Sequence, residues 1–159
     1  MYDTAKDLID ALRAAPVVLD TLLTGVTQTQ AMQARGGDEN WSVVEVLCHL
    51  RDAEERAVER MRLMRDQSEP MLAAFDQEQW AHERNYAAAD LREALKSFLQ
   101  FRAAHLAELS LLPMESWDRT GYHSEMGRIT LASHTLHIVS HDAIHLAQIA
   151  RQLGAIHAT

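Results

Sequence analysis

The chain contains few of the residues that break helices or cross-link a fold. Its 159 residues include one Cys, three Pro and six Gly, with three each of Trp, Tyr and Phe. A single cysteine, Cys48, excludes an intrachain disulfide. The scarcity of Pro and Gly leaves few positions at which a helix must end. These absences argue against a disulfide-stabilised scaffold and against a loop-rich β protein.

Positive charge and long apolar runs are also scarce. There are 15 Lys and Arg against 23 Asp and Glu, a formal net charge of −8 at pH 7. Nucleic-acid binding needs a clustered excess of Lys and Arg, so we expect no nucleic-acid partner. No run approaches the ~20 apolar residues of a membrane span, and the first residues do not resemble a secretion signal. We therefore expect no membrane contact and a cytoplasmic location.

The residues that are abundant predict an all-α protein. Hydrophobic residues make up 47% of the chain, and Ala, Leu, Arg, Glu, Met and Gln, which favour helices, dominate it. A chain of this length can bury one core, and no internal repeat or linker divides it, so we predict one domain over residues 1–159. Apolar spacing predicts four long helices, the last ending before Gly154. Their expected ranges are ~3–25, 42–66, 90–110 and 131–153.

The connections indicate how these helices are arranged. Ser42 with Glu45, and Asp90 with Glu93, have the spacing of helix-capping pairs at the starts of the second and third helices. Between them, residues 67–89 form a connection long enough to cross the bundle. The second and third helices can then be parallel, with the fourth antiparallel to both. A four-helix bundle is the expected fold class.

The chemistry of the chain is concentrated in histidines of the fourth helix. His137, His141 and His145 follow one another at intervals of four residues, which places them on one face of a helix beside its apolar stripe. One helix supplies too few ligands for a metal site, so a donor from another helix is required. His49 lies near the start of the second helix, and antiparallel packing would bring it level with His145. We therefore predict a mononuclear metal site formed by His49, His141 and His145.

Three neutral imidazoles leave coordination positions for water or substrate, which is typical of catalytic metal sites. All-nitrogen donors favour zinc or nickel, and iron or manganese stays open. Several neighbours are close enough in sequence to hold the imidazole N–H groups. They are Asp52, Gln148, Glu45 and Asp142. His137 is either a further ligand, a base beside the metal, or a polar residue at the edge of the core.

A small-molecule substrate would meet residues from two further segments. Arg56 and Arg60 lie on the same side of the second helix as His49 and could contact an anionic group, although an ion-paired, solvated face also accounts for them. The long connection must return to the predicted metal end, where Trp80 and Tyr86, with His82, Arg84 and Asn85, could cover the pocket. An ordinary surface loop is the alternative for these residues.

Other polar residues are expected to be structural. The acidic residues of the second helix, Asp52 and Glu54 among them, alternate with arginines and fit a solvated, ion-paired face. His105 is expected to be a hydrogen-bonded core histidine, His134 a surface group near a helix start, and Cys48 a packing residue.

The segments NWSVVEVLCHLRDAEERAVERM and GRITLASHTLHIVSHDAIHLAQIARQLG resemble the DinB-like superfamily, which includes bacillithiol and mycothiol S-transferases. The resemblance spans essentially the whole chain. It implies an up-down-down-up four-helix bundle that is homodimeric. The family's W-S-x-x-E-x-x-x-H segment implies His49 as one metal ligand, and its H-x-x-x-H segment implies His141 and His145 as the others.

The resemblance also implies a range of activities. Its characterised members use low-molecular-weight thiols, so the first hypothesis is an S-transferase that activates bacillithiol or mycothiol against a small electrophile. A metal-dependent hydrolase is one alternative. The other is a non-enzymatic, stress-related dimeric bundle that binds metal. No residue in the chain selects among the three.

Overall fold

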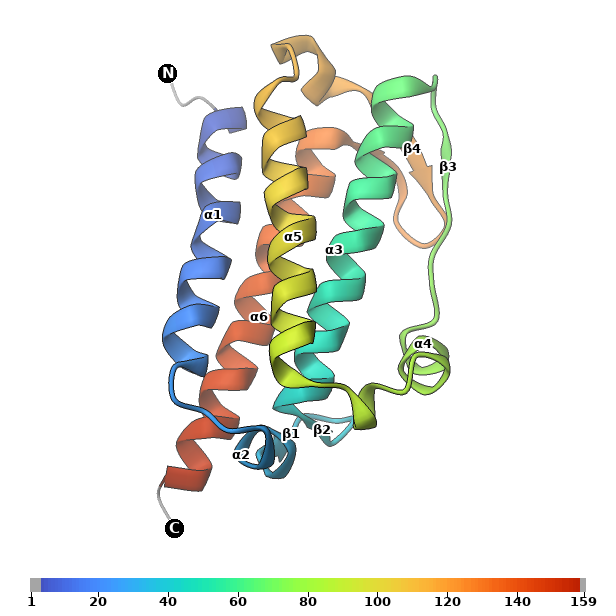
Figure 1. Ribbon diagram of the computed structural model, residues 1–159. Coiled ribbons are helices and arrows are strands. Elements are labelled where there is room, and N and C mark those ends of the chain that lie inside the picture. The colour runs from blue at the N-terminus through green and yellow to red at the C-terminus, as the bar shows by residue number, and fades with distance from the viewer. Residues whose placement is uncertain (1–3, 158–159) are drawn as a thin grey trace.

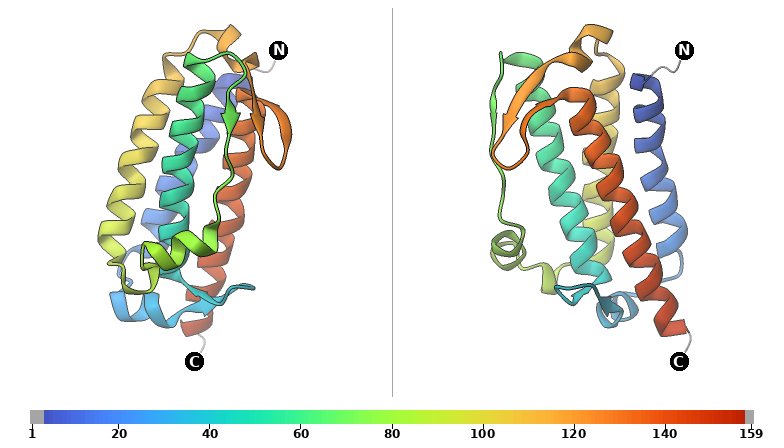
Figure 2. Two further views of the ribbon diagram at one scale, coloured as in Figure 1. Left: turned by 90° about the vertical axis from the view of Figure 1, so that its right-hand side faces the viewer. Right: turned by 180° about the vertical axis from the view of Figure 1, so that it is seen from behind.

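Four long helices lie side by side in the computed structural model, which describes residues 4–157 (Figure 1). They are α1 (Thr4–Leu23), α3 (Val43–Asp66), α5 (Leu91–Ser110) and α6 (Leu131–His157). α1 and α6 run in one direction, and α3 and α5 run in the other, as the two views of Figure 2 confirm. The fold is therefore the predicted up-down-down-up four-helix bundle.

The predicted capping residues start these helices. Ser42 Oγ accepts the backbone N–H of Glu45, and a Glu45 carboxylate oxygen accepts the N–H of Ser42 at 2.8 Å. Asp90 accepts two N–H groups at the start of α5. The predicted end of α6 is wrong, because the helix continues through Gly154 to His157. Ile156 packs against the core there, which offsets the weak helix preference of glycine.

The connections between the long helices contain short helices and strands, and the sequence analysis did not predict the strands. α2 (Gln28–Gln33) and the antiparallel pair β1 (Arg35–Gly36) and β2 (Trp41–Ser42) lie at the lower end of the bundle (Figure 1). At the upper end, β3 (Met71–Leu72) pairs in parallel with β4 (Thr120–His123), which forms a hairpin with β5 (Gly127–Thr130). The other short elements are α4 (Gln77–Glu83) and the 3-10 turns η1 (Tyr86–Ala88) and η2 (Met114–Asp118).

The crossover from α3 to α5 is the connection that makes these two helices parallel. After β3 it descends along the outside of the bundle, passes through α4 and η1, and reaches the start of α5 (Figure 2). Pairing of β3 with β4 holds its first part against the hairpin that precedes α6. The crossover and the hairpin therefore lie beside α3 and α6 (Figure 2).

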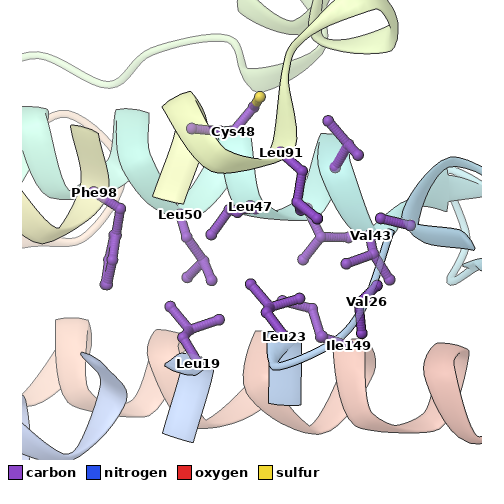
Figure 3. Close-up of a cluster of buried hydrophobic side chains, with 14 of the residues drawn as sticks. Leu19, Leu23, Val26, Val43, Leu47, Cys48, Leu50, Leu91, Phe98 and Ile149 are labelled. Atoms are coloured by element: carbon purple, nitrogen blue, oxygen red, sulfur yellow. The ribbon is translucent and has the colours of Figure 1, made fainter. Parts of the chain in front are cut away.

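Two apolar clusters form the core. The lower one joins all four helices through side chains such as Leu23, Leu47, Phe98 and Ile149 (Figure 3). The upper one is built around residues such as Leu12, Met61, Leu109 and Ile138. Among the described residues, no helix is long and apolar enough to cross a membrane.

An ionic cluster lies within the bundle. Arg102 of α5, 1% exposed, donates to both carboxylate oxygens of Glu54 of α3, at 2.8 and 2.7 Å, and pairs with Asp142 of α6 at 2.8 Å. It also donates to the carbonyl of Leu12 in α1, and His105 Nδ1 lies 2.8 Å from Glu54. All four long helices thus contribute to one buried network.

Burial corrects the prediction for two acidic residues of the second helix, one inside this network and one outside it. Glu54 and Asp52 are buried, so neither belongs to a solvated face. A pattern of alternating charges does not show which charged side chains point into the core. Their direction depends on how the helix is rotated about its axis against its neighbours. His105 is buried and bonded to Glu54, as expected of a core histidine.

Candidate metal centre

Antiparallel packing of α3 and α6 brings three imidazoles together. His49 lies in the second turn of α3, after the Ser42 cap, and His141 and His145 lie on successive turns of α6. The Nε2 atoms of His49 and His141 are 2.8 Å apart. One potential ligand atom from each of the three histidines lies within 4.8 Å of the other two. The rings therefore meet as their spacing in the sequence predicts.

The three rings also pack against one another. Ring centroids are 4.9 Å apart for His49 and His141, 4.7 Å for His49 and His145, and 4.5 Å for His141 and His145. Trp41 covers His49 from the start of α3, with ring centroids 5.3 Å apart. Metal–imidazole bonds are about 2.0–2.1 Å long. Donor atoms as close as these suit a single ion.

The protonation of the cluster also fits a metal. Burial, together with the charge of His145, lowers the pKa of His49 to about 4. Burial and the two neighbouring imidazoles lower the pKa of His141 to about 2. Both rings are therefore neutral at pH 7, the form in which imidazole binds metal. The residues present thus fit a divalent ion.

Gln148 holds one of the three rings in place. His145 Nδ1 lies 2.8 Å from Gln148 Oε1, so the ring donates through Nδ1 and turns Nε2 toward the other histidines. The amide nitrogen of Gln148 in turn approaches the carbonyl of Gly36 at 3.4 Å. A Cβ atom on Gly37, where φ is +79°, would lie 2.7 Å from that nitrogen. The β1–β2 turn therefore positions Gln148, a predicted support of the site.

Asp52, another predicted support, faces different partners. Its carboxylate accepts a hydrogen bond from the Tyr86 hydroxyl at 2.5 Å and pairs with Arg51 at 2.7 Å and Arg84 at 3.0 Å. Within residues 4–157, no hydrogen bond joins it to an imidazole of the cluster. Asp142 pairs with Arg102, and Glu45 caps α3. Of the proposed imidazole partners, Gln148 alone has a hydrogen bond to the cluster within the described chain.

A cavity of about 520 Å³ opens beside the histidines. His49 and His141 form part of its wall, with His137 and Ile138 of α6. The crossover contributes Phe75 and Asp76, and the β4–β5 hairpin contributes His123 and Glu125. His137 is a cavity residue, with its ring centroid 6.4 Å from that of His141.

The structure separates the four predicted substrate contacts. Arg60 lines the cavity and is 7% exposed. Arg56 instead pairs with Glu59 and stacks on the Trp80 ring at 5.0 Å. Trp80 packs on Phe75, which lines the cavity, and Tyr86 is buried against Asp52. Trp80 therefore supports the cavity wall from behind, Tyr86 lies away from the cavity, and Arg60 is the predicted residue that faces the cavity.

The structure also tests the predictions for His134 and Cys48, and it adds His123 to the site. His134 is 1% exposed with no hydrogen-bond partner for either ring nitrogen in the described part of the chain, so its prediction as a surface group is wrong. Burial raises the pKa of Cys48 to about 11, which agrees with a packing role. His123 was not predicted. It lies on β4, which pairs with β5 in a hairpin, and neither strand was predicted from the sequence.

A second cavity, of about 500 Å³, touches the cluster from the other side. It is lined by His145 and Gln148 of α6 together with the β1–β2 turn, including Gly37 and Glu39. The three histidines thus lie between two openings, one against the crossover and one against the turn.

The comparisons with known proteins agree with this geometry. The family model described as the DinB superfamily matches residues 11–149. A protein of Bacillus subtilis (strain 168), named "Putative metal-dependent hydrolase YfiT", is 22% identical over 150 residues, which cover 92% of this chain and 84% of that protein. The solved structure of YfiT, described as a probable metal-dependent hydrolase with an unusual four-helix bundle topology, superposes with a TM-score of 0.87 at 23% identity. That superposition covers 98% of this chain and 90% of YfiT. The family match spans most of the bundle and both histidine segments, so the chain belongs to the DinB superfamily.

Proposed function

We propose that the chain is a metal-dependent enzyme whose divalent ion is held by His49, His141 and His145. The observation that carries this proposal is the convergence of three imidazoles, two of which line the wall of a cavity. The name of the similar YfiT protein, "Putative metal-dependent hydrolase YfiT", supports the same kind of chemistry. Zinc or nickel suits an all-nitrogen donor set best.

Different residues around this site would bind the ion, orient its ligands and contact the substrate. An ion bound to three imidazoles would supply Lewis-acid chemistry and leave positions open to a nucleophile and a substrate. Gln148 fixes the orientation of His145, and Trp41 shields His49 from solvent. The crossover and the hairpin form two sides of the cavity, so a substrate bound there would contact these segments as well as the histidines.

Hydrolysis is the reaction that we favour, because it needs only one substrate besides water and agrees with the name of the relative. Transfer of a low-molecular-weight thiol, such as bacillithiol or mycothiol, is the second candidate. The second cavity at His145 favours it, since a reaction of two substrates needs room on both sides of the nucleophile. Either reaction would use the same three histidines.

Turnover by metal-loaded protein tests this proposal. Protein purified without a His tag is analysed for metal content, loaded with zinc or nickel, and assayed with 4-nitrophenyl acetate. A parallel assay supplies bacillithiol or mycothiol and a bromobimane electrophile. We expect His49→Ala to lower kcat/KM at least 100-fold, and His82→Ala, which changes an exposed histidine of α4, to leave it unchanged.

The outcomes separate the candidate functions. Turnover without thiol supports the hydrolase, and turnover only with thiol supports the S-transferase. A rate that is unaffected by chelation would contradict both. Metal-dependent stability without turnover in either assay would instead support the non-enzymatic, stress-related bundle.

The homodimer expected from the family resemblance stays a prediction. Light scattering during size-exclusion chromatography at micromolar concentration tests it. A mass of twice 17.9 kDa would agree, and a mass of 17.9 kDa would contradict it.

A further inference from the structure

Arg60 carries a buried positive charge that lacks a counterion. Its side chain lines the cavity beside His49 and His141 and is 7% exposed. One Nη2 proton goes to the carbonyl of Ala73 at 2.6 Å, and Nε has no partner in the described part of the chain. Within residues 4–157, no carboxylate lies within ion-pair distance of this guanidinium. A buried unpaired charge is costly, so an anion that neutralised it at the cavity wall would stabilise the protein.

The contrast with Arg102 shows that the chain can neutralise a buried arginine. Arg102 contacts two carboxylates, from Glu54 and Asp142, in the interior of the bundle. Arg56, one turn before Arg60, is likewise paired, with Glu59. Arg60 thus differs from both of these neighbours in the same bundle.

The surroundings of Arg60 do not supply the missing charge. Burial and the charge of Arg56 lower the pKa of Arg60, and the opposing influence of Glu125 and Glu59 is smaller. Glu125 lines the cavity but is exposed to solvent, which screens its charge. Asp76 and Glu78 also line the cavity and are likewise exposed, so the buried charge at its wall is the positive charge of Arg60.

His123 adds a hydrogen-bond donor to the same part of the cavity. Its Nδ1 lies 3.2 Å from the backbone nitrogen of Glu125 and 3.3 Å from that of Met126, and it accepts both N–H groups. Nδ1 therefore carries no proton, and the proton of the neutral ring is on Nε2. Burial, together with the charge of Arg60, lowers the pKa of His123, so the ring stays neutral. The hairpin thus fixes His123 as a donor through Nε2.

We propose that Arg60 and His123 form a subsite for a carboxylate carried by the substrate of the neighbouring histidine cluster. This inference rests on the proposed function and specifies its substrate class as small carboxylic acids. The free Nε–H and the remaining Nη protons form the planar fork that matches a carboxylate. One guanidinium and one neutral imidazole balance about one negative charge, so a carboxylate suits the subsite better than a phosphate dianion.

Binding of benzoate tests this subsite without any need for turnover. Calorimetry compares benzoate with the neutral benzamide on zinc-loaded protein. We expect wild type to prefer benzoate at least tenfold, and Arg60→Met to abolish the preference. Arg62→Met is the matched control, because Arg62 lies on the same helix but is exposed and pairs with Glu108, so it should keep the preference.

Two further measurements separate binding at Arg60 from binding at the metal and from misfolding of the variant. A carboxylate can bind a metal directly, so the titration is repeated on His49→Ala protein without metal, where the preference should persist. If it disappears there, the benzoate was bound to the ion and the subsite is refuted. Thermal melting shows whether Arg60→Met is folded. Benzoate should raise the Tm of wild type and Arg62→Met but not that of Arg60→Met, and equal shifts in all three would refute the subsite.

Failure of this inference can be told apart from failure of the proposed function. If metal-loaded protein cleaves charged and neutral esters equally well, and Arg60→Met cleaves both like wild type, the carboxylate subsite is wrong and the enzyme stands. If no substrate turns over but the benzoate preference depends on Arg60, the subsite stands and the proposed reactions are wrong.

Discussion

Two kinds of buried polar residue distinguish this bundle at the scale of single side chains. Glu54 and Arg102 neutralise each other through two hydrogen bonds, and both are 1% exposed. His134 is equally buried but lacks a hydrogen-bond partner within the described residues. The Glu54–Arg102 pair stabilises the fold as long as both charges are present. His134 can stay buried only while its ring is neutral.

Replacement of Glu54 by Gln should destabilise the protein strongly. The change keeps the shape of the side chain but removes the charge that faces Arg102 and His105. Breaking a buried ion pair costs about 3–5 kcal/mol where the remaining charge has no other partner, and Arg102 keeps Asp142, so we expect a loss near the lower end, about 3 kcal/mol. Urea denaturation measures the loss, and Glu59→Gln, at an exposed position of α3, should change the free energy of unfolding by less than about 0.5 kcal/mol. A loss below about 1 kcal/mol for Glu54→Gln would contradict the role of the cluster.

His134 should contribute to the loss of stability in acid. Burial, together with nearby positive groups, lowers its pKa to about 3, whereas the unfolded chain has a pKa near 6.5. Between these values the unfolded state binds the proton and the folded state does not, so stability falls as the pH falls. From pH 7 to pH 5 this one group accounts for about 2 kcal/mol.

Denaturation of His134→Leu at both pH values checks this contribution. The variant should lose about 2 kcal/mol less than wild type on acidification. His82→Leu, at an exposed histidine of α4, should behave like wild type. Identical pH dependence in wild type and His134→Leu would show that the ring is not held neutral.

At the scale of elements, the short connections between the long helices orient side chains around the histidine cluster. The β4–β5 hairpin presents His123 to the cavity, and its turn accounts for the two N–H groups that Nδ1 accepts. The β1–β2 turn lies against Gln148, which orients His145. The helices carry the three histidines of the cluster, and the two turns orient the side chains of His123 and Gln148 beside it.

Replacement of Gly37 by Ala should weaken metal binding through Gln148. The added Cβ would lie 2.7 Å from Gln148 Nε2, so Gln148 must shift away from His145. Loss of such a support lowers metal affinity about 10–100-fold. Competition with a chromogenic chelator measures the affinity for zinc.

Gly25→Ala provides a matched control. Gly25 also has a positive φ, +74° against +79° for Gly37, but a Cβ there meets nothing within 4 Å. Both variants should therefore lose a similar amount of stability, about 1 kcal/mol, from the strained backbone. Only Gly37→Ala should lose zinc affinity, and equal affinities in the two variants would contradict the role of the turn.

At the scale of the whole molecule, a metal held by α3 and α6 would join helices that are far apart in the sequence. His49 and His141 are separated by 92 positions, so the unfolded chain offers no preformed site. An ion that binds the folded state alone stabilises it by mass action.

Zinc at 100 times its dissociation constant should therefore raise the free energy of unfolding by about 2.7 kcal/mol. For a domain of this size, the corresponding rise in Tm is roughly 5–10 °C. Scanning calorimetry with zinc and with EDTA checks the shift. His82→Ala should keep it and His49→Ala should lose most of it, whereas an equal shift in both would place the ion elsewhere.

Much of this organisation was predictable from local patterns. The capping pairs at Ser42 and Asp90 predict two helix starts to within one residue, and the length of the 67–89 connection permits the parallel α3 and α5 that the structure has. The four-residue histidine spacing predicts a cluster on one face of α6. Each of these signals involves residues close in sequence, for which helix geometry determines the outcome.

Other features depended on packing between distant segments. Arg56 and Arg60 lie one turn apart and look alike in the sequence, yet one stacks on Trp80 and the other faces the cavity. His123 reaches the site only because β4 pairs with the crossover. Sequence patterns carry no information on such choices, because they follow from the path of a connection over the bundle.

The sequence by itself determined the four long helices and their order, because periodicity and capping are local properties of the chain, and its motifs indicated the family and the three histidines. Only the tertiary structure decided that Glu54 and His134 are buried, that Asp52 faces Tyr86, and that Arg60 and His123 share a cavity with the histidines. The rotation of each helix about its axis decides these contacts, and it is set by the packing of the whole core.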